Sequence, residues 1–209
     1  MQTRFLSFLL LAITLAVPAT AQKRASATKE PAFPEAIEQA KKAVESADYA
    51  AAVAALQAAI RDVQKKQRAA VLAALPKPEG FTIRDEDEKK DADNPFAAGL
   101  VALGMTLTRH YEGKGDKNLE VEVTANSPIV SMMSMMLTNP AIAKADGAEI
   151  VEYGAHKALL KASDGSQELS IVMHGKHLVK VTAHGMTADE LFAIFDQAAV
   201  DRLEKPLGK

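Results

Sequence analysis

Hydrophobic residues near the start of the chain recur every three or four positions, which is the spacing of one face of a helix. One such set consists of Ile37, Ala40, Val44 and Ala47. A second set consists of Val53, Leu56, Ile60, Val63 and Val71, with Gln67 interrupting it. Ser46 and Asp48 lie between the two sets and favour helix ends, whereas Pro76 and Pro78 stop a helix. The pattern predicts a helical hairpin over residues 35–75.

Beyond Pro78 the spacing changes to an alternation of apolar and polar residues, which is typical of strands with one buried face. In two neighbouring runs, the residues on one side are Met105, Leu107, Arg109 and Tyr111, then Leu119, Val121, Val123 and Ala125, and all except Arg109 are apolar or aromatic. A turn with two glycines, Gly113–Lys117, joins these runs into a hairpin. Further strands are predicted at Phe81–Arg84, Glu149–Tyr153, His156–Ala162, Gln167–His174 and His177–His184.

The last helix begins at a capping box of Thr187 and Glu190. It continues with Leu191, Phe192, Phe195, Ala198 and Ala199 at helical spacing. Together the elements predict an α+β fold, in which an antiparallel sheet of about six strands is covered by two helices and preceded by the helical hairpin. The α+β domain is assigned to residues 76–209. We expect the helices on one face of the sheet, and the opposite face then carries Glu120, Glu122, Lys180 and Thr182.

The first residues have the pattern of an export signal. Arg4 precedes an apolar run, Phe5–Val17, and Ala19–Ala21 provides small residues in an A-x-A cleavage pattern. This run of about 13 residues is short for a bilayer-spanning helix, which needs about 20, although an uncleaved anchor is the alternative interpretation. We predict a signal peptide at residues 1–21 and a linker at residues 22–34. The mature protein is then periplasmic or secreted, with no membrane span after cleavage.

The chain of 209 residues contains no cysteine, which excludes disulfides, thiol nucleophiles and cysteine-bound zinc. A mature chain of about 190 residues is long enough to bury a core without cross-links. Without Arg4 it carries 24 basic and 27 acidic residues, a net charge of −3, and shows no cluster of Lys and Arg. Because binding to nucleic acid requires such a cluster, nucleic acid is not expected as a partner.

The segment Ser127–Pro140 contains four of the chain's eight methionines. Ser127 as a cap and Pro128 at the first helical position predict a helix here. On a helical wheel, an apolar arc of about 160° is formed by Ile129, Val130, Met132, Met133, Met136 and Leu137. Met135 lies just outside the edge of this arc. The arc predicts a helix that packs on the sheet, with methionine side chains filling irregular gaps.

Copper binding is the alternative interpretation of the methionine cluster. Thioethers are soft ligands that favour Cu(I), and Met132, Met135 and Met136 could converge at one edge of the helix. An exposed surface for a partner is the third interpretation. Packing is favoured because the same helix face also carries branched aliphatic residues, whereas most copper-binding methionines lie in exposed segments.

The motif HGKH, His174 to His177, contains the only close pair among the chain's five histidines. A two-residue loop would place His174 opposite His177, close enough to share a metal ion. A three-residue loop instead pairs Met173 with His177 and places apolar residues opposite one another further along the strands. We favour this second register, which leaves His174 in the turn.

The sequence contains no nucleophile elbow, zincin helix, phosphate-binding loop or dinucleotide-binding fingerprint. We therefore predict a protein without catalytic activity and without a cofactor. The alternative is a hydrolase whose site is assembled from distant residues, which requires a deep pocket lined by carboxylates or histidines. The remaining function is binding. The bound molecule is either another protein of the cell envelope or a small apolar ligand, and the binding surface is either the sheet or Met135 and its neighbours. The helical hairpin either packs on the sheet domain or pairs with a second copy of the chain as a homodimer. Copper handling through the methionines is the alternative function.

Three features follow one another over about two-thirds of the chain: LPKPEGF at Leu75–Phe81, ANSPIVSMMSMMLTNP at Ala125–Pro140, and a β-meander that ends in an amphipathic helix. In this order the chain resembles a group of uncharacterised exported bacterial proteins. The resemblance implies export and a small α+β fold, and it implies no activity and no functional residues. The meander with its terminal helix also resembles PsbP/Mog1-type sandwiches, which implies a fold alone.

Overall fold

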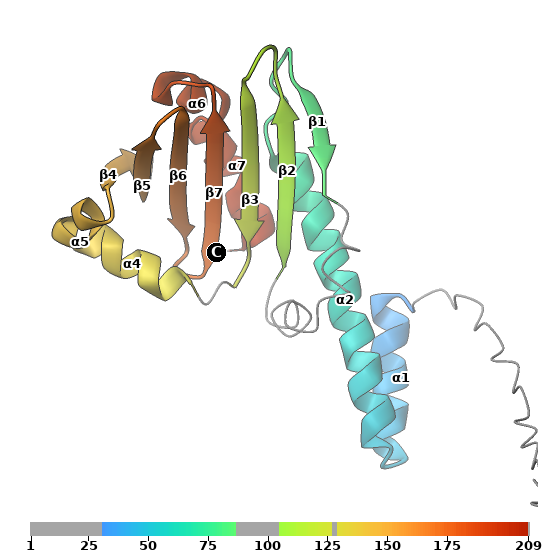
Figure 1. The fold of residues 1–209 in the computed structure, drawn as a ribbon. Coiled ribbons are helices and arrows are strands. Elements are labelled where there is room, and N and C mark those ends of the chain that lie inside the picture. Colours follow the sequence, from blue (N-terminus) through green and yellow to red (C-terminus); the bar gives the residue numbers. More distant parts are fainter. Residues whose placement is uncertain (1–30, 87–104, 127–128, 209) are drawn as a thin grey trace, which may run out of the picture.

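The computed structural model describes residues 31–86, 105–126 and 129–208 (Figure 1). The helices in these ranges are α1 (Phe33–Glu45), α2 (Tyr49–Ala74), α4 (Val130–Thr138), α5 (Pro140–Ala145), α6 (Ala188–Ile194) and α7 (Gln197–Leu207). The strands are β1 (Thr82–Asp85), β2 (Thr106–Glu112), β3 (Asn118–Thr124), β4 (Ala148–Tyr153), β5 (His156–Ser163), β6 (Ser166–Met173) and β7 (His177–His184). The predicted export signal, most of the linker, and Ser127 with Pro128 lie outside the described residues.

All of these strands belong to one antiparallel sheet with the order β1-β2-β3-β7-β6-β5-β4. The α+β class and the helical pair that precedes the sheet are therefore confirmed, with seven strands rather than about six. The hairpin β2–β3 and the meander β4–β7 are joined side by side, because β7 pairs with β3 through Val181 opposite Val121. β1 completes the sheet at the other edge, where Ile83 lies opposite Tyr111.

The turn between β6 and β7 has the predicted three-residue loop. Met173 is paired with His177, and Ile171 is paired with Val179. His174 begins the loop with a backbone φ of 52°, in the left-handed region that side chains other than glycine seldom adopt. The pairing of apolar residues on the buried face of β6 and β7 therefore determines the loop length. This loop length places His174 in a backbone conformation that is less favourable for a residue other than glycine.

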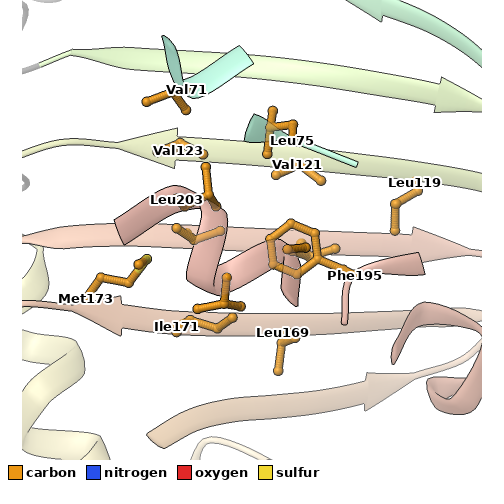
Figure 2. Packing of buried hydrophobic residues seen from close by; sticks show 14 of the residues in the cluster. Val71, Leu75, Leu119, Val121, Val123, Leu169, Ile171, Met173, Phe195 and Leu203 are labelled. Carbon is orange, nitrogen blue, oxygen red and sulfur yellow. The ribbon is translucent and has the colours of Figure 1, made fainter. Parts of the chain in front are cut away.

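One face of the sheet is covered by α2, α6 and α7, and the main hydrophobic core lies between these layers (Figure 2). The core side chains labelled in Figure 2 come from three parts of the chain. They are Val71 in α2 and Leu75 directly after it, Phe195 between α6 and α7 with Leu203 in α7, and, from the strands, Leu119, Val121, Val123, Leu169, Ile171 and Met173. Because successive side chains of a strand point to opposite faces, the alternation in the sequence becomes a single buried surface. Each fully buried Val, Leu or Phe contributes about 1.5–3 kcal/mol to stability.

The methionine-rich helix α4 lies on the opposite face of the sheet, at the edge formed by β4 and β5. Its side chains and those of α5 pack around Leu159 in a small separate cluster. Leu159 is in register with Ser170, which in turn pairs with Lys180, so this is the polar face of the sheet. The prediction that all helices cover one face is therefore wrong. The reason is that Ala158 and Leu159 are both buried, so β5 is apolar on both faces and supports a helix on each.

The predicted C-terminal helix is divided into two helices. The capping box that begins α6 is present, since the Glu190 backbone N–H donates to the Thr187 hydroxyl and the Thr187 N–H donates to the Glu190 carboxylate. A second cap follows, in which Asp196 accepts the N–H of Ala199 at 2.8 Å and begins α7. Phe195 lies between the two helices and is fully buried. A capping residue inside an apolar pattern therefore ends one helix and begins another.

Arg109 occupies an inward-facing position of β2 and is only 5% exposed. Its Nε and Nη2 donate to the carboxylate of Asp85 at 2.6 and 3.0 Å, and its Nη1 donates to the carbonyl oxygen of Leu72 at 2.8 Å. The hydrogen bond from Arg109 is the largest cause that lowers the pKa of Asp85. The arginine thus connects β1, β2 and the last turn of α2 through charge-assisted hydrogen bonds.

We expect Arg109→Leu to lower the free energy of unfolding by about 2–4 kcal/mol, because it leaves Asp85 and the Leu72 carbonyl without their donor. Urea unfolding followed by circular dichroism measures this change. Arg84→Leu is the matched control, because Arg84 lies on the neighbouring strand and forms an exposed ion pair with Glu112 at 3.5 Å. The control should cost less than about 1 kcal/mol. Equal losses in the two variants would contradict the role given to Arg109.

Candidate functional site

The methionine cluster is only half buried. Met133 and Met136 are partly buried against the cluster around Leu159, whereas Met132 and Met135 are 59% and 62% exposed. The predicted packing of the whole arc is therefore wrong on the side that carries Met132. A nine-residue helix at the edge of the sheet contacts it with a narrower strip than its apolar residues occupy. Of the three candidate copper ligands, two are exposed and Met136 lies at the boundary of the packed side.

The polar face of the sheet carries the residues that the alternation predicts. Glu120, Glu122, Lys180 and Thr182 are half-buried there. Lys180 lies 3.9 Å from the oppositely charged Glu122 on this face, and the imidazole of His110 lies 3.3 Å from the carboxylate of Glu120. Because acids and bases alternate on it, this face is a solvated surface of mixed charge and not a patch of one sign for a charged partner.

Three histidines lie together beside the C-terminal half of α7. His156 begins β5, His174 lies in the β6–β7 turn, and His177 begins β7. The ring centroids of His156 and His174 are 6.2 Å apart and those of His174 and His177 are 6.3 Å apart, in both cases edge to face. The Nε2 of His156 lies 3.4 Å from a carboxylate oxygen of Glu204, within ion-pair distance but without the alignment of a hydrogen bond.

The hydrogen bond that His177 accepts determines its tautomer. Its Nδ1 accepts the backbone N–H of Asn126 at 3.2 Å, so the proton of the neutral ring is assigned to Nε2. A protonated Nε2 does not coordinate a metal ion. In the part of the chain that the structure describes, no group of three or more His, Cys, Asp or Glu side chains is arranged to hold one.

Burial lowers the pKa of His177, whose side chain is 2% exposed. The positive charge of Lys176 and the neighbouring His174 lower this pKa further, and the backbone of Leu207 acts in the opposite direction. Protonation of His177 would place a charge inside the core. The folded protein therefore favours the neutral imidazole.

A groove of about 480 Å³ is lined by both helices of the hairpin and by residues at the ends of β2 and β3. Its lining consists of Phe33, Ile37, Leu56, Ala59, Ile60, Val63, Gln64, Gln67, Met105 and Asn126. The large apolar side chains Leu56, Ile60 and Val63 are themselves exposed. The groove is thus a shallow apolar surface, bordered at the sheet by two glutamines and one asparagine.

The apolar side of α2 continues along the whole helix, but only its last turns are covered. Val53 and Val71 are 18 residues apart, which is five helical turns, so they lie on the same side. Val71 is fully buried against the sheet, whereas Val53 is 54% exposed. The exposed part, which we call the α2 stripe, consists of Tyr49, Val53, Leu56, Ile60 and Val63. It lies where α1 and the first half of α2 extend beyond the sheet (Figure 1).

No protein-family model, curated protein or solved structure matches this chain. The resemblance to exported bacterial proteins therefore stays a prediction, and the candidate site has to be argued from the residues of this chain. Among the described helices, none combines the length and the apolar character needed to cross a membrane. The α2 stripe contains five of the large apolar side chains that are exposed among the described residues, and the groove lies beside it.

Sequence reasoning did not bring the three histidines together, and it left open whether the helical hairpin packs on the sheet domain or pairs with a second copy. One signal for the histidines was present in the sequence. His156 and His177 each begin a strand, and in a meander the starts of alternate strands lie at the same end of the sheet. No sequence signal showed at which residue of α2 the contact with the sheet begins, because the position of the sheet along the helix is a property of the tertiary structure.

We expect the stability of the protein to fall as the pH decreases from about 7 to about 5, in part through His177. Its pKa is lower in the folded protein than in the unfolded chain, so the unfolded chain binds more protons below about pH 6.5 and stability is lost there. His177→Asn keeps an acceptor for the Asn126 N–H and should reduce the pH slope, by at most about 1.4 kcal/mol per pH unit for one proton. Urea unfolding at several pH values measures the slope.

The control for this prediction is His184→Asn, which removes an exposed imidazole from the other end of the same strand. A pH slope that is unchanged in His177→Asn, or that is reduced equally in both variants, would show that burial of His177 is not its source.

Proposed function

We propose that this protein is a non-catalytic interaction protein of the cell envelope, exported and then released from its signal peptide. The N-terminal pattern of a basic residue, an apolar run and an A-x-A site supports export. The observation that carries the interaction is the α2 stripe, in which five large apolar side chains with 45–68% exposure lie on one side of a projecting helix. Exposed apolar patches of this kind mark sites of protein association.

The shape of the groove favours a protein over a small apolar ligand. Its volume of about 480 Å³ is in the range of ligand pockets, but such pockets bury most of the ligand surface. Here Phe33, Leu56 and Ile60 are exposed themselves, so a small molecule would remain in contact with water. A helix that lies along the groove would cover the same side chains along their whole length.

The interaction predicts that a photo-reactive amino acid at Val53 forms a discrete covalent adduct with a partner protein when the protein is produced in cells with its own leader. Val53 lies within the α2 stripe, and its side chain is available to a bound partner. Adducts are detected by irradiation and immunoblotting. The matched control is Ala54, which is exposed but lies about 100° further round the helix.

A defined adduct at Val53 and none at Ala54 would support the proposal. No adduct at Val53, or equal labelling at both positions, would contradict it, since a free helix surface is labelled without preference for one side.

Copper handling is the second candidate function, and the exposure of Met132 and Met135 favours it. The two side chains are three positions apart on α4 and therefore on one side of the helix. Met136 lies beside Met132 and could complete a set of three thioethers. Such a set is soft enough to prefer Cu(I) over the divalent ions of the envelope.

This function predicts that the protein binds one Cu(I) in competition with a chromophoric Cu(I) chelator. The double variant Met132→Leu with Met135→Leu should lose at least about 90% of this binding, because it removes two of three soft ligands. Its circular dichroism spectrum should be unchanged, since both side chains are exposed. No binding by the unmodified protein, or equal binding by the double variant, would exclude a methionine site.

A further inference from the structure

The residues of the α2 stripe have the spacing of a coiled-coil seam. Intervals of four and three residues alternate between Tyr49, Val53, Leu56, Ile60 and Val63. This two-in-seven pattern forms a narrow strip that suits contact with one other helix, and it is narrower than the apolar face of a helix in a globular core. The stripe is therefore suited to a partner that is itself a helix.

A different side of α2 is already occupied by α1. Ala58 and Ala59 of α2 pack against Ala36 of α1, and small residues of this kind let two helices approach closely. Ile37 packs beside this contact, and Phe33 and Ile37 line the groove together with Leu56 and Ile60. Both helices of the hairpin thus present apolar side chains to the same groove, which is the open half of a four-helix arrangement.

From these observations we propose that the occupant of the α2 stripe is the hairpin of a second copy of this chain, packed antiparallel to the first. The proposal rests on the proposed interaction function and names its partner. A two-fold contact of this type is self-complementary, so the same apolar surface serves on both sides. One structural consequence is that the groove of each copy is closed by α2 of the other.

The charges along α2 favour the antiparallel direction. Tyr49–Ile60 contains no charged residue, whereas residues 61–68 contain four basic residues and one acidic residue. A parallel pair would place the two basic segments side by side, and like charges repel. In an antiparallel pair each basic segment lies beside the hairpin turn of the other copy, which carries Glu45 and Asp48. The antiparallel direction is therefore favoured twice, because it brings opposite charges together and keeps the two basic segments apart.

The stripe also determines the register of such a pair. Its central residue is Leu56, so an antiparallel two-fold axis passes beside Leu56 and places it next to the same residue of the other copy. Val53 then lies opposite Ile60, and Tyr49 lies opposite Val63. The hairpins extend beyond the sheets (Figure 1), so the two sheet domains come to lie at opposite ends of the helix bundle and do not overlap.

The expected contact is small. The α2 stripe is about 21 Å long, and a surface two helices wide measures about 20 Å across. The interface is then about 420 Å² on each copy and about 840 Å² in total, which is below the range of stable complexes and typical of weak, transient ones. We expect a dissociation constant in the micromolar range, and the measurements therefore require protein concentrations up to about 100 μM.

Because the chain contains no cysteine, a single introduced cysteine can form a disulfide only with the same residue of another copy. Disulfide formation therefore measures this contact directly. Four single-cysteine variants are purified without the predicted export signal: Leu56→Cys, Tyr49→Cys, Val63→Cys and Ala54→Cys. Each is oxidised under mild conditions, so that a disulfide between two copies forms only where the cysteines are close. Leu56→Cys should form at least about ten times more covalent dimer than Ala54→Cys, because only residues near the two-fold axis come within disulfide distance of themselves. Tyr49→Cys and Val63→Cys should cross-link with each other when mixed, and each should cross-link poorly alone.

Sedimentation of the unmodified protein and of Ile60→Lys measures the association without a cross-link. Ile60→Lys should weaken dimerisation at least about tenfold and leave the circular dichroism spectrum unchanged, since Ile60 is exposed in the single copy. A monomer at about 100 μM, or no excess of dimer for Leu56→Cys, would overturn the proposal. Equal self-cross-linking at Tyr49, Leu56 and Val63 would also overturn it, because that result requires a parallel pair.

The photo-adduct at Val53 separates this proposal from the proposed function. An adduct with twice the mass of the chain supports both. An adduct with a different envelope protein, together with a monomeric purified protein, supports the interaction function and overturns the second copy as occupant. The absence of any adduct overturns the interaction function itself.

Discussion

The last turns of α2 are held against the sheet, and the positions of the α2 stripe and of the groove beside it depend on this contact. Val71 and Leu75 are buried in the main core, the Tyr111 hydroxyl donates to the carbonyl of Pro76 at 3.0 Å, and Arg109 donates to that of Leu72. Apolar burial supplies the stabilisation, and the two hydrogen bonds determine where along the helix the contact falls. Because the contact uses only the end of the helix, the remaining turns extend beyond the sheet with α1 as their neighbour.

This arrangement gives α2 two kinds of surroundings on one side. Within the core, its apolar side chains are fully removed from water, whereas the same side of the helix five turns earlier is exposed. Exposed apolar area of this size is stabilised by a partner and otherwise favours nonspecific association. In the proposed pair of hairpins, the apolar side chains of the α2 stripe are covered by the same surface of a second copy. The proposed antiparallel direction follows from the charge distribution along α2.

The histidine cluster and the methionine helix show how similar residues acquire different roles. The ring of His174 lies between those of His156 and His177, with centroid distances of 6.2 and 6.3 Å. The backbone N–H of Asn126 donates to the Nδ1 of His177, so the Nε2 of the neutral ring carries the proton. Burial also lowers the pKa of His177, so the folded protein favours the neutral ring. The methionines of α4 are shared between packing and solvent, since the helix covers only the edge of the sheet. Their two exposed thioethers are the part of the cluster that a soft metal ion could reach.

The sequence by itself determined the class of fold, the strands, the β6–β7 register and the helical hairpin, because these follow from local spacing: alternation, three-and-four periodicity, capping residues and turns. The same local patterns could not decide which face of the sheet α4 covers, since β5 is apolar on both faces. They also could not reveal the partners of Arg109 or the point along α2 at which its apolar side ceases to be covered by the sheet. These features join residues from distant parts of the chain, and their geometry exists only after the sheet has brought those parts together. Periodicity records which side of an element is apolar, whereas tertiary packing decides how much of that side is covered.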